Sequence, residues 1–113
     1  MDCVFCNIAA GKIPSTIVYQ DSEVIAFRDI NPIASTHIII IPGKHIPSLA
    51  DISRDDLPLV SRMVGFANSL AKQEGVSEKG YRLVINSGKE GGQIVPHLHM
   101  HLIGGRKLAD ALG

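Results

Sequence analysis

Hydrophobic residues recur with two different periods along this chain of 113 residues. Between about Ser53 and Gly75 they return every three or four positions, which is the spacing of one face of a helix. Elsewhere, short runs of β-favouring residues are typical of strands. These runs cover residues 16–20, 23–27, 36–41, 81–86 and 97–103. The pattern therefore predicts one long helix and five strands.

A second, short helix is predicted from Asp2 to Ala10, where apolar residues again have helical spacing and Gly11 can end the helix. Asp21-Ser22 separates the first two strands and suits a tight turn, which predicts a hairpin. Only one helix is long enough for the crossover that neighbouring parallel strands need. We therefore expect a single α+β domain over residues 1–113, with a mainly antiparallel sheet.

The charges balance, with 11 Lys plus Arg against 11 Asp plus Glu. This balance disfavours a nucleic-acid-binding protein, which usually carries a basic surface, and it favours self-association. The sequence opens without an apolar signal segment, and its longest apolar run, Ile38–Ile41, is far too short to cross a membrane. We therefore expect a cytoplasmic protein whose two cysteines are reduced or bind a metal.

Three of the five histidines stand at alternate positions, 97, 99 and 101. On a strand, alternate side chains share a face, so these three imidazoles are expected to point one way while the residues between them enter the core. The residues between and after them are Leu98, Met100 and Leu102. Such a face indicates chemistry, because imidazole is a nucleophile, an acid or base near neutral pH and a metal ligand.

Two interpretations of this histidine face compete. In one, the three rings hold a transition metal directly; in the other, the face binds a phosphate that one ring attacks. Gly91-Gly92 lies just upstream, where bare backbone N–H groups can approach an anion closely. The strand itself lacks a carboxylate, the usual further ligand of a histidine metal site. These features favour phosphate chemistry.

The only two cysteines, Cys3 and Cys6, form one C-x-x-C pair. Three interpretations stay open: half of a structural zinc site that needs two more ligands, two unliganded thiols packed in a helix, and a redox pair. The redox pair is the least favoured, because no βαβ pattern surrounds these residues.

The run His97-Leu98-His99-Met100-His101-Leu102-Ile103 resembles the signature of the histidine triad (HIT) superfamily of nucleotide hydrolases and transferases. Together with Gly91-Gly92-Gln93 before it and Gly104-Gly105-Arg106 after it, the run resembles the Hint-type branch of purine nucleoside phosphoramidases. The resemblance extends to Phe27–Pro32, Thr36-His37, Ile41–His45, Gly80–Arg82 and Asn86. It implies a HIT-like fold whose five-stranded, mainly antiparallel sheet, with one long and one short helix, extends across a homodimer.

The resemblance also implies an activity. Members of this branch hydrolyse purine nucleoside 5′-phosphoramidates, which are AMP or GMP conjugates of amines, without a cofactor. By similarity, His99 attacks the phosphate and becomes transiently nucleotidylated. His101 would hydrogen-bond a phosphate oxygen, His37 would relay or hold the proton, and Asn86 would fix the phosphate and the leaving group.

The remaining contacts are likewise implied by the resemblance. Asp29 would bind the ribose hydroxyls, and the backbone of Gly92 and Gln93 would hold the phosphate. Ile94 stands where this branch often carries a hydroxyl near the leaving group, so the handling of that group is open. The base pocket would be lined by Val4, Phe5, Ile8, Phe27 and Ile30.

Two further expectations concern metal and specificity. Some bacterial members of the superfamily hold zinc through residues that correspond here to Cys3, Cys6, His45 and His97. The tail, residues 107–113, lacks the Trp-Pro-Pro ending of animal relatives, which leaves the substrate preference open. Alternative functions are a dinucleoside polyphosphate hydrolase or nucleotidyltransferase of the same superfamily, a non-catalytic nucleotide-binding interaction protein, and a metal-binding module.

Overall fold

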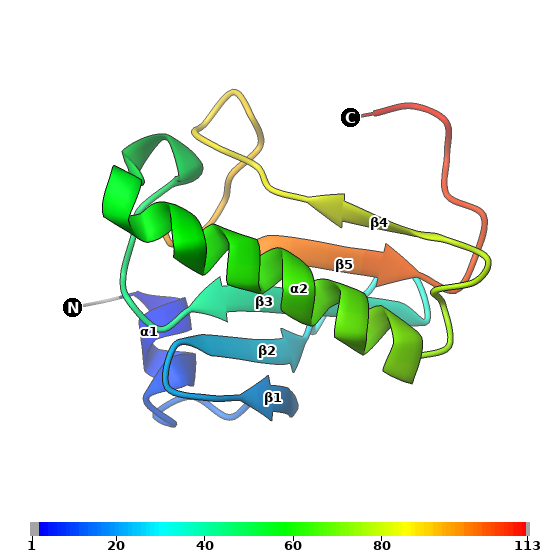
Figure 1. Cartoon of the computed structure of the whole chain (residues 1–113), viewed down its shortest axis with the longest axis horizontal. Helices are drawn as coiled ribbons and strands as arrows, with labels where there is room; N and C mark the ends of the chain where they lie inside the picture. Colours follow the sequence, from blue (N-terminus) through cyan, green and yellow to red (C-terminus); the bar gives the residue numbers. More distant parts are fainter. Residues whose placement is uncertain (1–2, 113) are drawn as a thin grey trace.

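Two helices and five strands make up the protein in the computed structural model, which describes residues 3–112 (Figure 1). Along the chain they are α1 (Val4–Ala9), β1 (Ile17–Gln20), β2 (Val24–Arg28), β3 (Thr36–Pro42), α2 (Leu57–Gln73), β4 (Tyr81–Val84) and β5 (Met100–Gly104). Two short 3-10 turns, Leu49–Asp51 and Arg54–Asp56, precede α2. The expected α+β class is confirmed; Asp2, where the first helix was expected to begin, lies outside the described residues.

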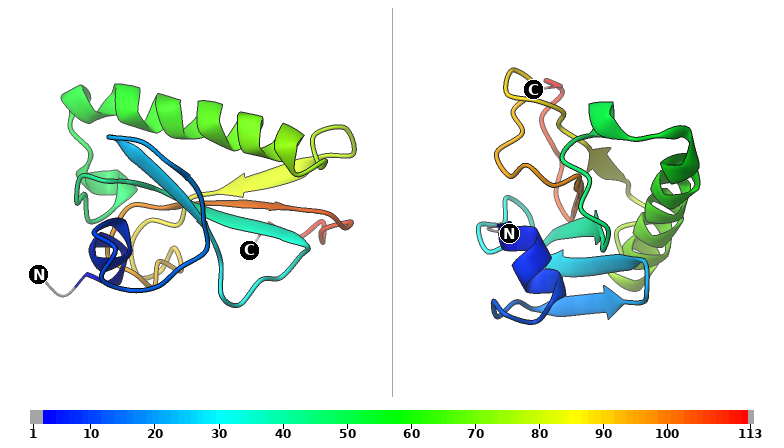
Figure 2. Two further views of the ribbon diagram at one scale, coloured as in Figure 1. Left: turned by 90° about the horizontal axis from the view of Figure 1, so that it is seen from below. Right: turned by 90° about the vertical axis from the view of Figure 1, so that its left-hand side faces the viewer.

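The strands form one sheet in the order β1-β2-β3-β5-β4, and every neighbouring pair is antiparallel. Helix α2 covers one face of the sheet, whereas α1 and the loop before β5 lie on the other face (Figure 2). No helix within residues 3–112 combines the length and the apolar character needed to cross a bilayer.

The run of isoleucines in β3 divides between the two faces, because side chains alternate along a strand. Ile38 and Ile40 join the core beneath α2, whereas Ile39 and Ile41 pack on the opposite face. That opposite face also contains Phe5 from α1 and is where the functional groups gather. Leu98, Met100 and Leu102 all belong to the core beneath α2, as the alternation predicted.

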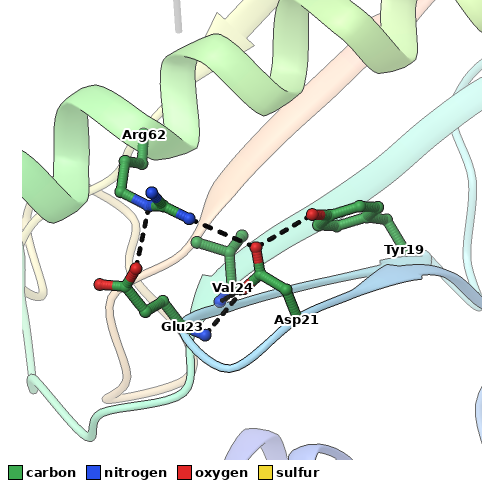
Figure 3. A network of polar contacts seen from close by, with 5 residues as sticks. All are labelled: Tyr19, Asp21, Glu23, Val24 and Arg62. Carbon is green, nitrogen blue, oxygen red and sulfur yellow. Dashed lines mark hydrogen bonds and ion pairs between the residues drawn. The ribbon is translucent and has the colours of Figure 1, made fainter.

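Helix α2 is fixed at its start and along its outer side. The Ser53 backbone N–H donates to the Asp56 carboxylate just before the helix, and Pro58 lies in its first turn, where a missing N–H costs nothing. Arg62 then pairs with Asp21 and Glu23 in the turn between β1 and β2 (Figure 3). These contacts hold α2 against the hairpin and leave the other face of the sheet free for the site.

The predicted start of the last strand, β5, is wrong. We expected a strand over 97–103, but β5 begins at Met100, so His97 and His99 lie in the irregular segment that leads into it. The reason is that the Leu98 N–H donates to the carbonyl of Ile46, in the loop beyond β3, at 2.6 Å. Pro42, at the end of β3, has no N–H to offer a longer ladder. Similarly, β4 ends at Val84, and Asn86 follows it in the loop.

Candidate active site

A cavity of about 410 Å³ opens on the face of the sheet that α2 does not cover. One side is formed by α1 and the segment after it, and the other by the loop that precedes β5. All five residues expected to form an apolar base pocket line it, namely Val4, Phe5, Ile8, Phe27 and Ile30. His99 and His101 also line this cavity, so an apolar pocket and two imidazoles share one space.

The ring of His99 is held in one tautomer. Its Nδ1 lies 2.7 Å from the carbonyl oxygen of His97, and a carbonyl can only accept, so Nδ1 carries the proton. In the neutral ring, the Nε2 atom therefore keeps its lone pair. The ring is only 6% exposed, and the Phe5 ring packs edge-on against it with 5.0 Å between centroids. This arrangement holds the His99 ring rigidly on the wall of the cavity.

A hydrogen-bonded pair of histidines, His37 and His101, lies beside the ring of His99. The Ile33 backbone N–H donates to Nδ1 of His37 at 3.2 Å, so the proton of neutral His37 resides on Nε2. That Nε2 lies 2.9 Å from Nδ1 of His101, which must then accept. The proton of His101 consequently resides on its own Nε2. The backbone amide of Ile33 thus determines the tautomer of two rings in series.

Burial above all, together with the neighbouring rings of His99 and His37, lowers the pKa of His101 to about 4, while Asp29 opposes the shift. His101 is therefore neutral at physiological pH and acts as a hydrogen-bond donor rather than a fixed cation. A neutral donor can polarise a phosphoryl oxygen, and it does not repel protons from the neighbouring rings.

Asp29 follows β2 directly and is tied to β3. Its backbone N–H donates to the carbonyl of His37 at 2.9 Å, and its Oδ1 accepts from the Asn31 N–H at 2.8 Å. The other carboxylate oxygen, Oδ2, lies 3.3 Å from Nε2 of His37. The side chain is 17% exposed and lines the cavity, so it combines a solvent-facing carboxylate with a contact to the histidine pair.

The loop before β5 provides further residues that line the cavity. Asn86, Gly92 and Ile94 line the cavity, and the Asn86 side-chain amide donates to the Gly91 carbonyl at 2.8 Å. Gln93, expected to contact the nucleotide through its backbone, is not among the residues that line the cavity, and its side chain bonds within and beside the loop.

The side chain of Gln93 accepts from the Gly88 N–H at 2.9 Å and donates to the carbonyls of Pro47 and Val95. The backbone N–H groups of Gly92 and Gln93 are also engaged within the loop, with the carbonyls of Lys89 and Gly88. They were expected to bind a phosphate, and in this conformation neither is free to do so.

A separate group of four side chains that could hold a metal ion lies near the start of α1. Its members have ligand atoms within 4.8 Å of one another. They are Cys3, which caps α1, Cys6 in the first turn of α1, His45 of the loop after β3, and His97. The Nε2 of His97 lies 2.9 Å from the Pro42 carbonyl, which directs its unprotonated Nδ1 toward the two sulfurs.

These distances fit a tetrahedral metal. With Zn–N near 2.0–2.1 Å and Zn–S near 2.3 Å, the edges of a tetrahedral zinc site are about 3.3–3.6 Å for pairs that include nitrogen. Here Nδ1 of His97 lies 3.2 Å from Nδ1 of His45 and 3.4 Å from Sγ of Cys3, and Sγ of Cys6 lies 3.2 Å from Nδ1 of His45. Burial and the neighbouring Cys3 raise the pKa of the Cys6 thiol when no cation is present. The donor set therefore fits zinc.

The three histidines of the sequence pattern therefore lie in two different sites. His97 faces the cysteines, whereas His99 and His101 line the cavity. Within residues 3–112 the side chains that could share a metal ion form two groups, and neither contains all three histidines. The structure does not support a module in which these three rings bind one metal.

Sequence reasoning missed several members of the cavity. Ile13, Pro14, Ile39 and Val95 line it as well. The alternation along β3 could have placed Ile39 opposite Ile38 and Ile40, but nothing local marks the other three. The backbone amide of Ile33 was also missed, because a main-chain donor leaves no signal in residue type.

Known proteins are similar to this chain in sequence and in fold. The HIT domain family matches residues 10–108. The chain is 50% identical over 111 residues to the purine nucleoside phosphoramidase of Escherichia coli (strain K12), a match that covers 98% of this chain and 93% of that protein. The crystal structure of a HIT family hydrolase from Legionella pneumophila Philadelphia 1 superimposes with a TM-score of 0.97 at 49% identity, covering 99% of this chain and 100% of that one.

A more distant relative of known structure is a zinc-bound protein. The Zn-bound histidine triad family protein from Mycobacterium smegmatis is 29% identical, with a TM-score of 0.82 over 100% of this chain and 81% of that one. The family resemblance read from the histidine pattern is confirmed by sequence and by fold. With its alternating histidines, five-stranded antiparallel sheet and nearly full-length relatives, this chain belongs to the HIT domain family.

Proposed function

We propose that this protein hydrolyses purine nucleoside 5′-phosphoramidates through a covalent nucleotidyl intermediate on His99. The observation that carries the proposal is the hydrogen bond from Nδ1 of His99 to the His97 carbonyl, which leaves Nε2 unprotonated in a ligand-sized cavity. The purine nucleoside phosphoramidase of Escherichia coli, with half of its residues identical over nearly the whole length, supports the same substrate class.

Different parts of the cavity lining would contact the base, the ribose and the phosphate of a nucleotide. The purine would lie among Phe5, Ile8, Phe27 and Ile30, where apolar and aromatic surface favours a flat ring. The ribose hydroxyls would donate to the Asp29 carboxylate, which accepts hydrogen bonds well. The phosphate would then lie between His99 and His101, with Asn86 and the glycine loop beside the leaving group.

The reaction has two steps, transfer of the nucleotidyl group to His99 and its hydrolysis by water. First, the Nε2 lone pair of His99 forms a bond to phosphorus while the bond between phosphorus and the substrate amine breaks; the amine leaves with that electron pair and takes up one proton from the site. Second, water bonds to phosphorus, the bond to Nε2 breaks, and the proton lost by water replaces the one taken. His101 donates from Nε2 to a phosphoryl oxygen in both steps, where negative charge gathers.

We also propose a structural zinc ion at Cys3, Cys6, His45 and His97. The donor atoms have the chemistry and the separations that zinc prefers, and the zinc-bound relative from Mycobacterium smegmatis supports the assignment. Bound there, zinc would supply a cross-link between α1, the loop after β3 and the segment before β5. The hydrolysis itself needs no cofactor, because His99 and His101 provide the nucleophile and the donor.

A homodimer is the third part of the proposal. Within residues 3–112, strand β4 pairs only with β5, so its outer edge presents backbone donors and acceptors that a second copy can cover. Leu57 and Val64 on α2 are exposed apolar residues. Light scattering at micromolar protein should give the mass of two chains; the mass of one chain would reject the dimer.

We further place the protein in the cytoplasm and assign the whole chain, residues 1–113, to one HIT domain. Both cysteines are free thiols, and a reducing compartment keeps them available for metal. Cell fractionation with an antibody to the protein tests this location.

The test of the activity is incubation with adenosine 5′-phosphoramidate, followed by rapid acid-free quenching and mass spectrometry. We expect AMP and free amine as products, and an added AMP on the peptide that contains His99. Diadenosine polyphosphate is assayed in parallel, and faster turnover of that compound would favour a dinucleoside polyphosphate hydrolase. Binding of AMP with no turnover of either compound would favour a nucleotide-binding interaction protein.

A further inference from the structure

The turn that ends β5, Gly104-Gly105-Arg106, packs against the segment that leads into β3. Gly105 has a φ of +99°, and a Cβ at this position would collide with Oγ of Ser35, so the close approach requires glycine. Beside it, Nε of Arg106 donates to the carbonyl oxygen of Ile33 at 2.8 Å. Among the described residues that line the cavity, none belongs to this turn. The turn therefore acts on the site only through the segment it holds.

Ile33 connects this turn to the histidine pair through its main chain. Its carbonyl accepts from Arg106, and its N–H donates to Nδ1 of His37 at 3.2 Å, which is long for a hydrogen bond from a backbone N–H. The two groups belong to neighbouring peptide units, so a fixed carbonyl restricts the direction of the N–H. The Ile33 side chain is 55% exposed, and packing therefore holds this residue weakly. The guanidinium is itself oriented by a bond from Nη1 to the Lys107 carbonyl at 3.1 Å.

The Ile33 N–H decides between two arrangements of the histidine pair. Nε2 of His37 and Nδ1 of His101 lie 2.9 Å apart, and when both rings are neutral only one of these atoms carries the hydrogen between them. With the Ile33 N–H on Nδ1 of His37, that hydrogen belongs to His37, and His101 has its own on Nε2. In the reverse arrangement His101 donates from Nδ1, and its bare Nε2 cannot donate to a phosphoryl oxygen.

We propose that Arg106 is a positioning residue that keeps the hydrogen of His101 on Nε2 by holding the main chain of Ile33. This inference rests on the proposed hydrolysis, in which that Nε2 donates to the phosphoryl oxygen. Without the Arg106 side chain, the Ile33 N–H points less firmly at His37, and the reverse arrangement of the pair becomes populated. Fewer molecules then present a donor to the phosphate, so kcat falls while the nucleotide still binds.

The kinetic test separates the hydrogen bond of Arg106 from its charge. Arg106→Ala should lower kcat for adenosine 5′-phosphoramidate about threefold to tenfold, the effect of one hydrogen bond, and change the dissociation constant of AMP less than about twofold. Arg106→Lys keeps the charge but puts a methylene in the place of Nε, and it should show a similar loss. Lys107→Ala removes a neighbouring charge from an 84% exposed side chain and is the matched control, with wild-type kcat. Full activity in Arg106→Lys, or an equal loss in Lys107→Ala, would assign the effect to charge and overturn the proposal.

A spectroscopic measurement tests the inference apart from the activity. At pH 8, where an ordinary histidine is neutral, the ¹⁵N signal of Nε2 in His101 should be that of a nitrogen bearing hydrogen in the wild-type protein and in Lys107→Ala. In Arg106→Ala and Arg106→Lys it should move toward that of a bare nitrogen, which a loss of stability alone would not cause. Unchanged ring signals in both Arg106 variants would overturn the inference and leave the hydrolysis intact. Absence of turnover in the wild-type protein would refute the proposed function, and the ¹⁵N signals would still decide whether Arg106 sets the tautomer.

Discussion

The carbonyl oxygen of His97 and Nδ1 of His99 lie 2.7 Å apart, and this one hydrogen bond joins the two functional regions of the protein. His97 belongs by its side chain to the group around Cys3 and Cys6, yet its main chain orients the ring of His99. Phe5, between the two cysteines in sequence, packs edge-on against both histidine rings. The main chain of His97 and the ring of Phe5 therefore hold the His99 ring from two sides.

Replacing the nucleophile should separate turnover from binding. His99→Ala is expected to lower kcat by at least about a thousandfold, because no other unprotonated nitrogen takes its place. The affinity for AMP should change less than tenfold, since the base pocket and Asp29 remain. Steady-state assays and titration calorimetry measure the two effects. An equal loss of turnover and of AMP affinity would show that this ring mainly binds the nucleotide.

Zinc should depend on His45 and be independent of His37. The freshly purified protein is expected to hold about one zinc ion per chain, as measured by atomic absorption. His45→Gln should lose the metal and the stability it supplies, which is about 4 kcal/mol when free zinc stands at a thousand times its dissociation constant. His37→Gln removes a histidine outside the group and should keep the zinc. Full zinc content in His45→Gln would refute the site.

Stability should fall as the solution is acidified from pH 7 to pH 5, and His101 should be one cause. Burial lowers the folded-state pKa of His101 to about 4, while an unfolded histidine titrates near 6.5. Between these values the unfolded chain binds more protons, so the neutral buried ring stabilises the fold above pH 6.5 and that stabilisation is lost as pH falls toward 4.

The variant His101→Asn should reduce this pH dependence by about 1–2 kcal/mol between pH 7 and pH 5. Urea unfolding at the two pH values measures it. The comparison is made on zinc-loaded protein, because burial also lowers the pKa of the metal-free His97. An unchanged pH dependence in the variant would mean that His101 titrates normally in the folded protein.

Ile94 should influence the choice of leaving group and leave the fold unaffected. Its side chain lines the cavity yet is 91% exposed, so Ile94→Ser should change the free energy of unfolding by less than about 0.5 kcal/mol. The ratio of kcat/KM for an apolar amine over a polar one should fall about threefold to tenfold, since one apolar contact is lost. An unchanged ratio, with both substrates turned over, would place the leaving group away from this residue.

The sequence by itself determined the elements and the two faces of the central strands, and its resemblance to a known family indicated five of the residues that line the apolar pocket. Helical and strand periods are local properties, so alternation alone predicted that Leu98 and Met100 face the core, away from the neighbouring histidines. The C-x-x-C pair likewise indicated a possible metal ligand pair, and the clustered histidines indicated phosphate or metal chemistry, from residue type alone. No packing information was needed for any of these inferences.

Only the tertiary structure decided which partners each ring meets. The start of β5 at Met100 depends on a hydrogen bond to Ile46, and the use of Gln93 to close its loop depends on carbonyls from two segments. The tautomers of His37 and His99 depend on main-chain groups that residue type does not reveal. Such contacts join positions far apart in the chain or lie on the backbone, and their geometry arises only when the two faces of the sheet are packed.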